Sequence, residues 1–155
     1  MGIFIKSRIF LPLVLIFLIL GCSKTEAAGD IILRDLNGRQ VNLSGQKGRP
    51  AILLFWTTWC RFCRDEIKAL NQNYTQIERE GITVLAVNVS ESEDKVRKFF
   101  KGYPLNFRLL LDENGLASGK YHIFGVPTYI LLDENGKVIA SENRFPSNYK
   151  ALLLR

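Results

Sequence analysis

Apolar residues follow two different spacings along the chain, and the two spacings alternate. The continuous apolar run at 51–55 is typical of a strand that a sheet buries on both faces, and the mostly apolar segment 82–89 predicts a second buried strand. Between these runs, over 67–77, apolar residues recur at helical spacing. This spacing predicts a helix over 60–80 that Gly81 ends, because glycine adopts the left-handed conformation after a helix without strain.

Shorter segments continue the alternation of strands and helices. Asn37-Gly38 predicts a hairpin with a type I′ turn, and Asn135-Gly136 predicts a second hairpin. Ser90 and Glu93 match a capping box, which predicts a helix that runs to about Lys101. Further strands and helices are expected at 31–36, 39–43, 108–111, 115–121, 128–132, 137–140 and 148–155. The expected fold class is therefore α/β, as a three-layer α/β/α sandwich around a central mixed sheet that includes an N-terminal hairpin.

The first 21 residues differ from the rest of the chain. Lys6 and Arg8 are their only charges, and 9–20 is a run of twelve uncharged residues interrupted only by Pro12. Twelve helical residues span about 18 Å, which is shorter than the roughly 30 Å hydrocarbon core of a bilayer. A basic start, a short apolar run and small residues after it indicate an export signal rather than a spanning helix.

The end of this run carries a second signal. The sequence Ile19-Leu20-Gly21-Cys22-Ser23 resembles a bacterial lipobox, which implies that Cys22 is lipidated and becomes the first residue of the mature chain. The alternative is simple cleavage nearby, with Cys22 left as a free thiol. Acyl chains contribute about 0.8 kcal/mol for each buried CH₂, so more than one chain anchors a protein stably. Ser23 in place of Asp favours the outer membrane if the cell is Gram-negative. We therefore expect a signal peptide at 1–21, a lipidated Cys and tether at 22–30, and one folded domain at 31–155.

Charge and cysteine content narrow the class of protein. The chain has 21 Lys+Arg against 15 Asp+Glu and a net charge of +6. Removal of 1–21 takes away two basic residues and no acidic one, so the mature chain has a net charge of +4. Because its basic residues are spread along the chain rather than clustered, nucleic acid is not an expected partner. Three Cys are too few for a disulfide-rich scaffold or a four-Cys zinc site, and 155 residues suit one domain.

Cys60 and Cys63 carry the candidate chemistry. They directly follow the apolar run at 51–55 and begin the predicted long helix. The N-terminus of a helix offers unpaired N–H groups and a partial positive charge, and Arg61 adds a full positive charge, so a thiolate is favoured there. Because the first Cys of such a pair is normally the exposed one, Cys60 is the expected nucleophile and Cys63 the resolving thiol of a dithiol–disulfide cycle.

Three other interpretations of the pair stay open at this point. A structural disulfide is plausible for an exported protein, although a bridge across two residues closes too small a loop to stabilise much. Half of a zinc site is a second interpretation, for which only His122 and Cys22 offer further soft ligands. A buried apolar pair of Cys is the third, and the position at a helix start argues against it.

Two motifs together resemble those of the TlpA/ResA-like thiol-disulfide oxidoreductases of the thioredoxin superfamily. They are Phe55-Trp56-Thr57-Thr58-Trp59-Cys60-Arg61-Phe62-Cys63-Arg64-Asp65-Glu66, which resembles the active-site segment, and Gly125-Val126-Pro127-Thr128, which resembles the cis-proline loop. The resemblance implies a thioredoxin-like fold and an extracytoplasmic enzyme that reduces protein disulfides, as relatives do for apocytochrome c. It also implies electrons from a membrane thiol transporter of the DsbD/CcdA type. No cofactor or metal is implied, and we expect a monomer.

The resemblance also implies roles for residues near the pair. Pro127 is expected to be cis, which leaves the Val126 backbone available to an extended substrate. Glu66 matches an acidic residue of this family that handles protons during thiol exchange, and a solvated helix charge is the equal alternative. Most relatives have Pro where Phe62 stands. The residues expected to contact substrate are Trp59, Arg61, Phe62, Val126, Pro127 and Thr128.

Three other functions are compatible with the same sequence. A thiol oxidant would use the same fold and the same pair in the opposite direction. A peroxide-reducing enzyme is suggested by Thr57, which stands three residues before Cys60 as in peroxiredoxins, but Leu53 replaces the earlier Pro of that motif. A copper-binding metallochaperone would use His122 with the two Cys, as in SCO-like proteins, but those proteins have C-x-x-x-C and lack the cis-Pro loop.

Overall fold

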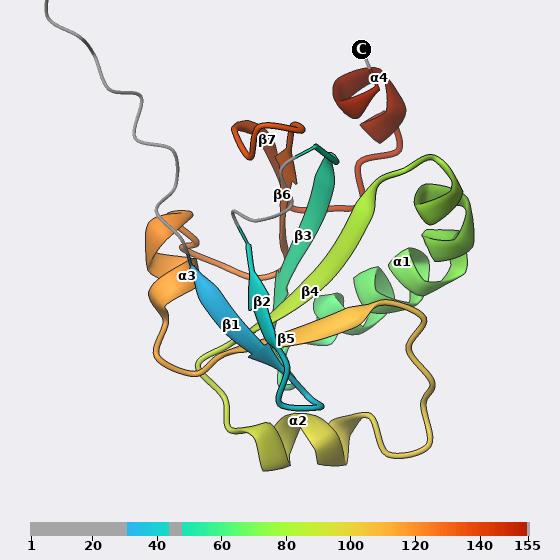
Figure 1. Cartoon of the computed structure of the whole chain (residues 1–155). Coiled ribbons are helices and arrows are strands. Elements are labelled where there is room, and N and C mark those ends of the chain that lie inside the picture. The colour runs from blue at the N-terminus through green and yellow to red at the C-terminus, as the bar shows by residue number, and fades with distance from the viewer. Residues whose placement is uncertain (1–30, 44–47, 155) are drawn as a thin grey trace, which may run out of the picture.

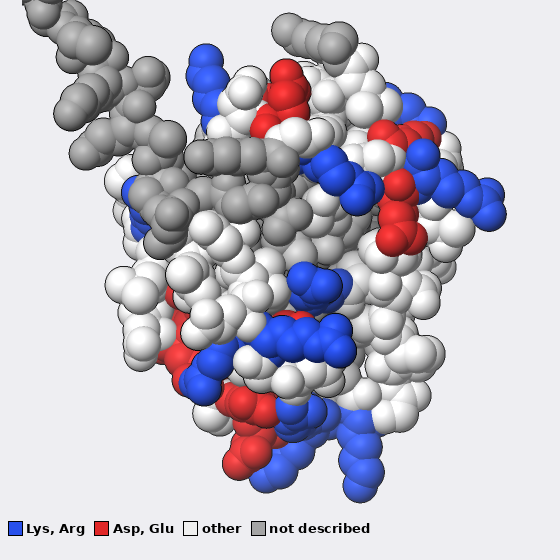
Figure 2. All heavy atoms as spheres, in the orientation of Figure 1, with Lys and Arg blue, Asp and Glu red and all other residues white. Residues whose placement is uncertain are grey.

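The computed structural model describes residues 31–43 and 48–154. The expected signal peptide at 1–21 and the lipidated Cys and tether at 22–30 lie outside these residues, so they stay predictions. Among the described residues, no helix is long and apolar enough to cross a bilayer. On the face shown in Figure 2, Lys and Arg side chains are interspersed with Asp and Glu.

Within residues 31–43 and 48–154, the fold is built around one mixed sheet of seven strands in the order β2-β1-β5-β4-β3-β6-β7 (Figure 1). The strands are β1 Ile32–Asp35, β2 Gln40–Asn42, β3 Ala51–Trp56, β4 Thr83–Val89, β5 Arg108–Asp112, β6 Thr128–Leu132 and β7 Val138–Glu142. The central strands β3, β4 and β5 are parallel, and the two hairpins add antiparallel strands on both sides. This arrangement confirms the predicted mixed sheet with an N-terminal hairpin.

Helices cover both faces of the sheet and complete the predicted three layers. The helices are α1 Arg61–Arg79, α2 Glu93–Phe99, α3 Leu116–Lys120 and α4 Tyr149–Leu153. Residues of α1, α2 and α4 share one apolar cluster, whereas Ala117 of α3 belongs to the cluster on the other face. Successive residues of β3 alternate between these two clusters, because neighbouring side chains in a strand point to opposite faces. The continuous apolar run at 51–55 is thereby explained.

The ends of α1 follow from local sequence. Cys60 is the N-cap in extended conformation, so the helix begins directly after it. At the other end, the Gly81 N–H donates to the Glu78 carbonyl and the Ile82 N–H donates to the Ile77 carbonyl. Gly81 has a φ of 80°, which completes a Schellman motif and confirms the predicted end of the helix.

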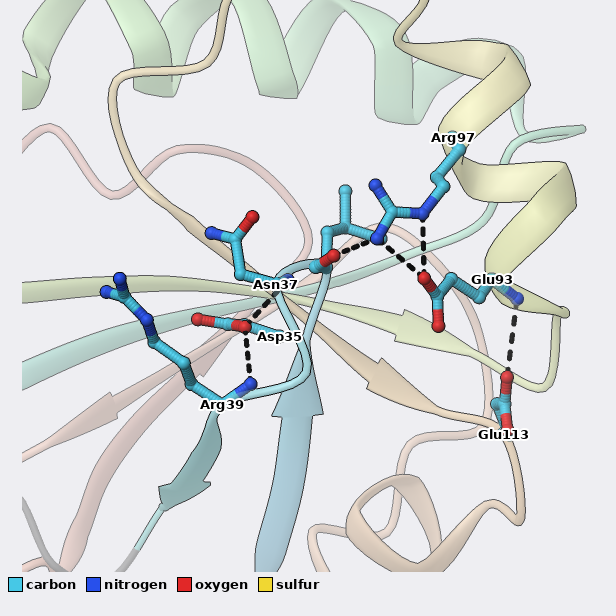
Figure 3. Close-up of polar contacts among 7 residues, drawn as sticks. Asp35, Asn37, Arg39, Glu93, Arg97 and Glu113 are labelled. Atoms are coloured by element: carbon cyan, nitrogen blue, oxygen red, sulfur yellow. Dashed lines mark hydrogen bonds and ion pairs between the residues drawn. The ribbon is translucent and has the colours of Figure 1, made fainter.

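The turn of the first hairpin differs from the predicted type I′ geometry, and the second hairpin has the same kind of turn. Gly38 and Gly136 have positive φ, but Asn37 and Asn135 do not. In the first hairpin, Asp35 Oδ1 accepts hydrogen bonds from the N–H groups of Asn37 and Arg39 (Figure 3). Asp133 makes the same pair of bonds in the second hairpin. The aspartate therefore lengthens each turn by one residue, and only glycine takes the left-handed position.

The predicted capping box at Ser90 is wrong. The Ser90 N–H continues the sheet by donating to the Asp112 carbonyl, and Ser90 has a φ of 53°. The helix α2 begins after Ser92 and ends at Phe99, two residues before the predicted end. Its first N–H, that of Glu93, donates to the Glu113 carboxylate at 3.3 Å (Figure 3). A capping box requires a free N–H and an extended backbone at its first residue, and Ser90 has neither.

An arginine of α2 holds the N-terminal hairpin. The Arg97 guanidinium donates to the Leu36 carbonyl at the tip of the hairpin and pairs with Glu93 one turn earlier (Figure 3). The hairpin is thus attached to the body of the fold at its tip as well as along β1.

Candidate active site

Cys60 and Cys63 form a disulfide at the point where β3 gives way to α1. The loop of Thr57–Cys60 turns the chain from the sheet into the helix, and the Cys60 N–H donates to the Thr57 carbonyl. The two Cα atoms are 5.3 Å apart, because one helical turn separates the residues. The sheet and the helix thus hold both sulfur atoms at one edge of the molecule.

The two sulfur atoms differ in exposure and in hydrogen bonding. Cys60 is 6% exposed and Cys63 is fully buried, so the first Cys of the pair is the more exposed one, as expected. Their roles as nucleophile and resolving thiol stay predictions. The Cys63 N–H, in the first turn of α1, donates to Cys60 Sγ at 3.1 Å. A helix N–H aimed at this sulfur stabilises negative charge on it, so the geometry favours a thiolate at Cys60 after reduction.

A proline loop lies against the same sulfur. The peptide bond between Val126 and Pro127 is cis, as predicted. The Val126 carbonyl oxygen lies 3.6 Å from Cys60 Sγ. Two hydrogen bonds stabilise the loop: the Thr128 hydroxyl donates to the Gly125 carbonyl, and the Asn143 amide, just after β7, donates to the Pro127 carbonyl. A rigid backbone segment therefore lies next to the reactive sulfur.

The residues predicted to contact substrate fall into two groups. Trp59 and Phe62 are 69% and 72% exposed, and Arg61 is exposed between them, so all three surround the disulfide at the surface. Val126 is half-buried beside Cys60, whereas the side chains of Pro127 and Thr128 are buried. The structure thus brings these residues together, and it limits Pro127 and Thr128 to shaping the loop rather than presenting their side chains.

Glu66 lies one turn after Cys63 but faces β6. Its Oε2 atom accepts hydrogen bonds from the Tyr129 hydroxyl at 3.1 Å and from the Phe145 N–H at 2.9 Å. Burial, and then the charge of Glu66 and the hydrogen bond to it, raise the pKa of Tyr129 far above its ordinary value, so the hydroxyl keeps its proton and donates. Neither sulfur atom is among the hydrogen-bond partners of Glu66 in the described chain, so its role in proton transfer stays a prediction.

A second carboxylate, Glu91, was missed by the sequence reasoning. Its side chain is 4% exposed. It accepts hydrogen bonds from the Thr58 N–H at 2.6 Å, the Thr58 hydroxyl at 2.7 Å and the Asn88 amide at 2.9 Å, and it pairs with Lys95 at 2.6 Å. Burial opposes its ionisation, but the bonds from Lys95, Asn88 and Thr58 outweigh burial and lower the pKa of Glu91. A buried anion thus fixes the loop two residues before Cys60.

The position of Glu91 in the sequence offered a partial signal. An acidic residue two positions after a buried apolar run lies at the carboxyl end of a central strand, where parallel α/β sheets place their functional groups. Its contact with Thr58 spans 33 residues, and no local pattern predicts that contact.

The geometry offers little for a metal ion. Among the described residues, no three side chains of His, Cys, Asp or Glu gather as possible ligands. His122 is exposed, and its ring is stacked with that of Phe124 at a centroid distance of 6.5 Å. His122 is therefore a histidine of the protein surface.

Comparison with known proteins agrees with the geometry. Residues 25–141 match the AhpC/TSA family. Thiol-disulfide oxidoreductase ResA of Bacillus subtilis is 35% identical over 117 residues, which cover 76% of this chain and about 65% of the length of ResA. A structure from Chlorobium tepidum, described as a thiol:disulfide interchange protein DsbE, is 32% identical with a TM-score of 0.71, and the match covers 81% of this chain and 89% of that one.

A third protein resembles this chain more distantly. The exposed lipoprotein thioredoxin of Streptococcus pneumoniae strain TIGR4 is 25% identical with a TM-score of 0.69, over 81% of this chain and 95% of that one. The segment that matches the family model includes both cysteines and the proline loop. The chain therefore belongs to the AhpC/TSA family, as a ResA-like member of the thioredoxin superfamily.

Proposed function

We propose that the chain is an extracytoplasmic thiol-disulfide oxidoreductase that reduces protein disulfides through Cys60 and Cys63. The observation that carries the proposal is the position of Cys60 Sγ, between the first turn of α1 and the Val126 carbonyl of the cis-proline loop. This position combines a stabilised thiolate with a backbone segment that can align an extended polypeptide.

The proposed cycle begins with the dithiol. The Cys60 thiolate attacks one sulfur of the substrate disulfide, which forms a mixed disulfide and releases the other substrate sulfur as a thiolate. The Cys63 thiol loses its proton and attacks Cys60 Sγ, which releases the second substrate thiol and leaves the Cys60–Cys63 disulfide. The substrate gains two electrons and the enzyme loses two. We assign the Cys63 proton to Glu66, because it lies one turn away on α1 and two donors hold its carboxylate in place.

The oxidised enzyme must then regain two electrons from a thiol donor. We propose a membrane protein of the DsbD/CcdA type as donor and apocytochrome c as one substrate. We also propose that acylated Cys22 anchors the chain to a membrane, with 22–30 as a tether. The lipobox and the similarity to a lipoprotein thioredoxin support the anchor. Absence of incorporated palmitate in cells grown with the labelled acid would refute it.

Substitution of each cysteine tests the reaction. Cys60→Ser is expected to abolish reduction of insulin by dithiol-charged protein, because the attacking sulfur is lost. Cys63→Ser is expected to accumulate a mixed disulfide with substrate, which non-reducing electrophoresis detects. Full activity in both variants would place the reaction elsewhere.

The direction of electron flow is a separate part of the proposal. The same geometry supports oxidation of thiols, and thioredoxin-like pairs cover roughly −270 to −120 mV. Equilibration with a glutathione buffer measures the potential of the Cys60–Cys63 pair. A value near the upper limit would overturn the assignment as a reductant and favour an oxidant.

A further inference from the structure

A small cavity lies beside the active-site helix, on the side away from the proline loop. Its volume is about 150 Å³, which suits one apolar side chain. It lies between the first half of α1 and the end of α2. The residues that line it are Arg64, Ile67, Lys68, Phe99, Phe100 and Tyr103.

The position of the cavity follows from helical geometry. Residues of α1 are rotated by roughly 100° each, so Arg64 and Lys68 share one flank and Glu66 lies on the other, with buried Cys63 and Ile67 between. The observed contacts agree with this placement of the two flanks. Arg64 Cζ lies 5.5 Å from the centre of the Phe99 ring of α2, whereas Glu66 accepts a hydrogen bond from Tyr129 of β6.

The sheet order places the cavity and the proline loop on different sides of the disulfide. Strand β3, which leads into Cys60, lies between β6 and β4. The proline loop precedes β6, and α2 follows β4. A polypeptide that crosses the disulfide from the Val126 backbone therefore reaches the α2 side.

Aromatic rings form the apolar wall of the cavity. The Phe100 ring lies 5.3 Å from Trp56, 4.9 Å from Phe99 and 6.3 Å from Tyr103 between ring centres. Trp56 is fully buried, so the cluster is anchored in the core, while Phe99 and Phe100 are half-buried and Tyr103 is exposed. The wall is thus fixed from below and partly open to solvent.

Two cations at the rim have no acidic partner among the described residues. Arg64 and Lys68 are exposed and form no ion pair with any residue in the described part of the chain. By contrast, Lys95 and Arg97 of α2 each pair with a glutamate one turn earlier. An apolar cavity with unpaired positive charge on its rim is complementary to an apolar group next to carboxylates.

We propose that this cavity is a docking site for the substrate polypeptide, and that it takes an apolar side chain next to acidic residues. The inference rests on the proposed function, because the polypeptide is the one whose disulfide Cys60 attacks. From Cys63 to Lys68 the helix rises about 7.5 Å, which an extended chain covers in two or three residues. The preferred substrate therefore carries a Phe-Glu-Glu-like segment a few residues from its cystine.

Three disulfide peptides of equal length test the site. One carries Phe-Glu-Glu three residues from its cystine, one carries Phe-Gln-Gln, and one carries Ala-Glu-Glu. The wild type is expected to have kcat/KM about tenfold higher for the first peptide than for the second, the effect of two ion pairs at a partly exposed rim. The Ala-Glu-Glu peptide is expected to have a much lower kcat/KM than the Phe-Glu-Glu peptide, because its alanine leaves the cavity empty.

The variant Arg64→Glu/Lys68→Glu separates docking from chemistry. It is expected to reduce the ratio of kcat/KM between the acidic peptide and the Gln peptide to one or below, and a ratio cancels any change in thiol reactivity. The control Lys120→Glu/Lys137→Glu has the same change in charge at exposed sites away from the cavity and is expected to keep the wild-type ratio.

The outcomes distinguish the two proposals. Equal kcat/KM values for the three peptides with the wild type would overturn the docking site, as would equal loss of the ratio in both double variants. Failure of the wild type to reduce any of these peptides, or hydroxyethyl disulfide, would instead overturn the proposed function.

Discussion

Removal of the Glu91 carboxylate is expected to destabilise the fold strongly. In Glu91→Ala, the Thr58 N–H, the Thr58 hydroxyl and the Asn88 amide lose their shared acceptor in a buried place. Each unpaired buried donor costs about 1–3 kcal/mol, whereas half-exposed Lys95 regains water. The expected loss in the free energy of unfolding is therefore about 3–5 kcal/mol, the size seen when one partner of a buried ion pair is removed.

A matched control lies two residues later, at the start of α2. Glu93 also pairs with a cation one turn later, Arg97, but both side chains are nearly half exposed. Glu93→Ala is expected to cost at most about 1 kcal/mol, because solvent screens such a pair. Urea denaturation of the oxidised proteins at neutral pH measures both losses. If the losses in free energy of unfolding of Glu91→Ala and Glu93→Ala differ by less than about 1 kcal/mol in this assay, the buried carboxylate does not fix the loop as described.

The effect of Glu91 is expected to depend on pH in one direction. Its pKa in the folded protein is lower than the ordinary value of 4.5, so the folded state binds fewer protons than the unfolded state in the acidic range. The stabilisation is complete above that value and is lost as the pH falls through the lowered folded pKa. The difference between wild type and Glu91→Ala should therefore shrink in acid, and a constant difference from neutral pH to pH about 3 would contradict the linkage.

Two further predictions concern glycine and tyrosine. Gly119→Ala, within α3, is expected to stabilise the protein by up to about 1 kcal/mol, because a methyl group there meets no atom within 4 Å. Gly38→Ala, at a φ of 76°, is expected to cost about 1–2 kcal/mol despite similar open space, and equal effects in thermal unfolding would contradict the turn geometry. Burial and the bond to Glu80 raise the pKa of Tyr149 to about 12, so stability should fall from pH 10.0 to about 12 as the unfolded state alone loses the proton. Tyr149→Phe should show a smaller loss of stability over this range, and a loss equal to that of the wild type would refute the prediction.

Local sequence predicted the parts of the site that lie on one element. Cys60 and Cys63 follow from a strand run and a helix start, and the order of their exposure follows from the helix. The cis bond at Pro127 was predicted from a family resemblance, because X-Pro sequence by itself gives only about a 5% chance of it.

Contacts between distant elements could not be predicted in this way. Thr58 meets Glu91 because β3 and β4 are parallel in the register that pairs Trp56 with Asn88. The turn of the first hairpin differs from its prediction because the Asp35 carboxylate takes two backbone N–H groups. Both effects depend on where a polar side chain finds partners, and a hydrophobic pattern does not contain that information.

The attachment of the N-terminal hairpin has a consequence for local unfolding. β1 joins the rest of the sheet at two register pairs, Arg34 with Leu111 and Asp35 with Leu110, whereas β3 pairs with β4 at six. Segments with fewer bonds to the body open at lower free energy and exchange their amide hydrogens sooner. We therefore expect the amide hydrogens of the hairpin to exchange before those of β3, β4 and β6. Cys60 and Cys63 follow β3, so local opening of the hairpin is expected to leave the positions of both sulfur atoms unchanged.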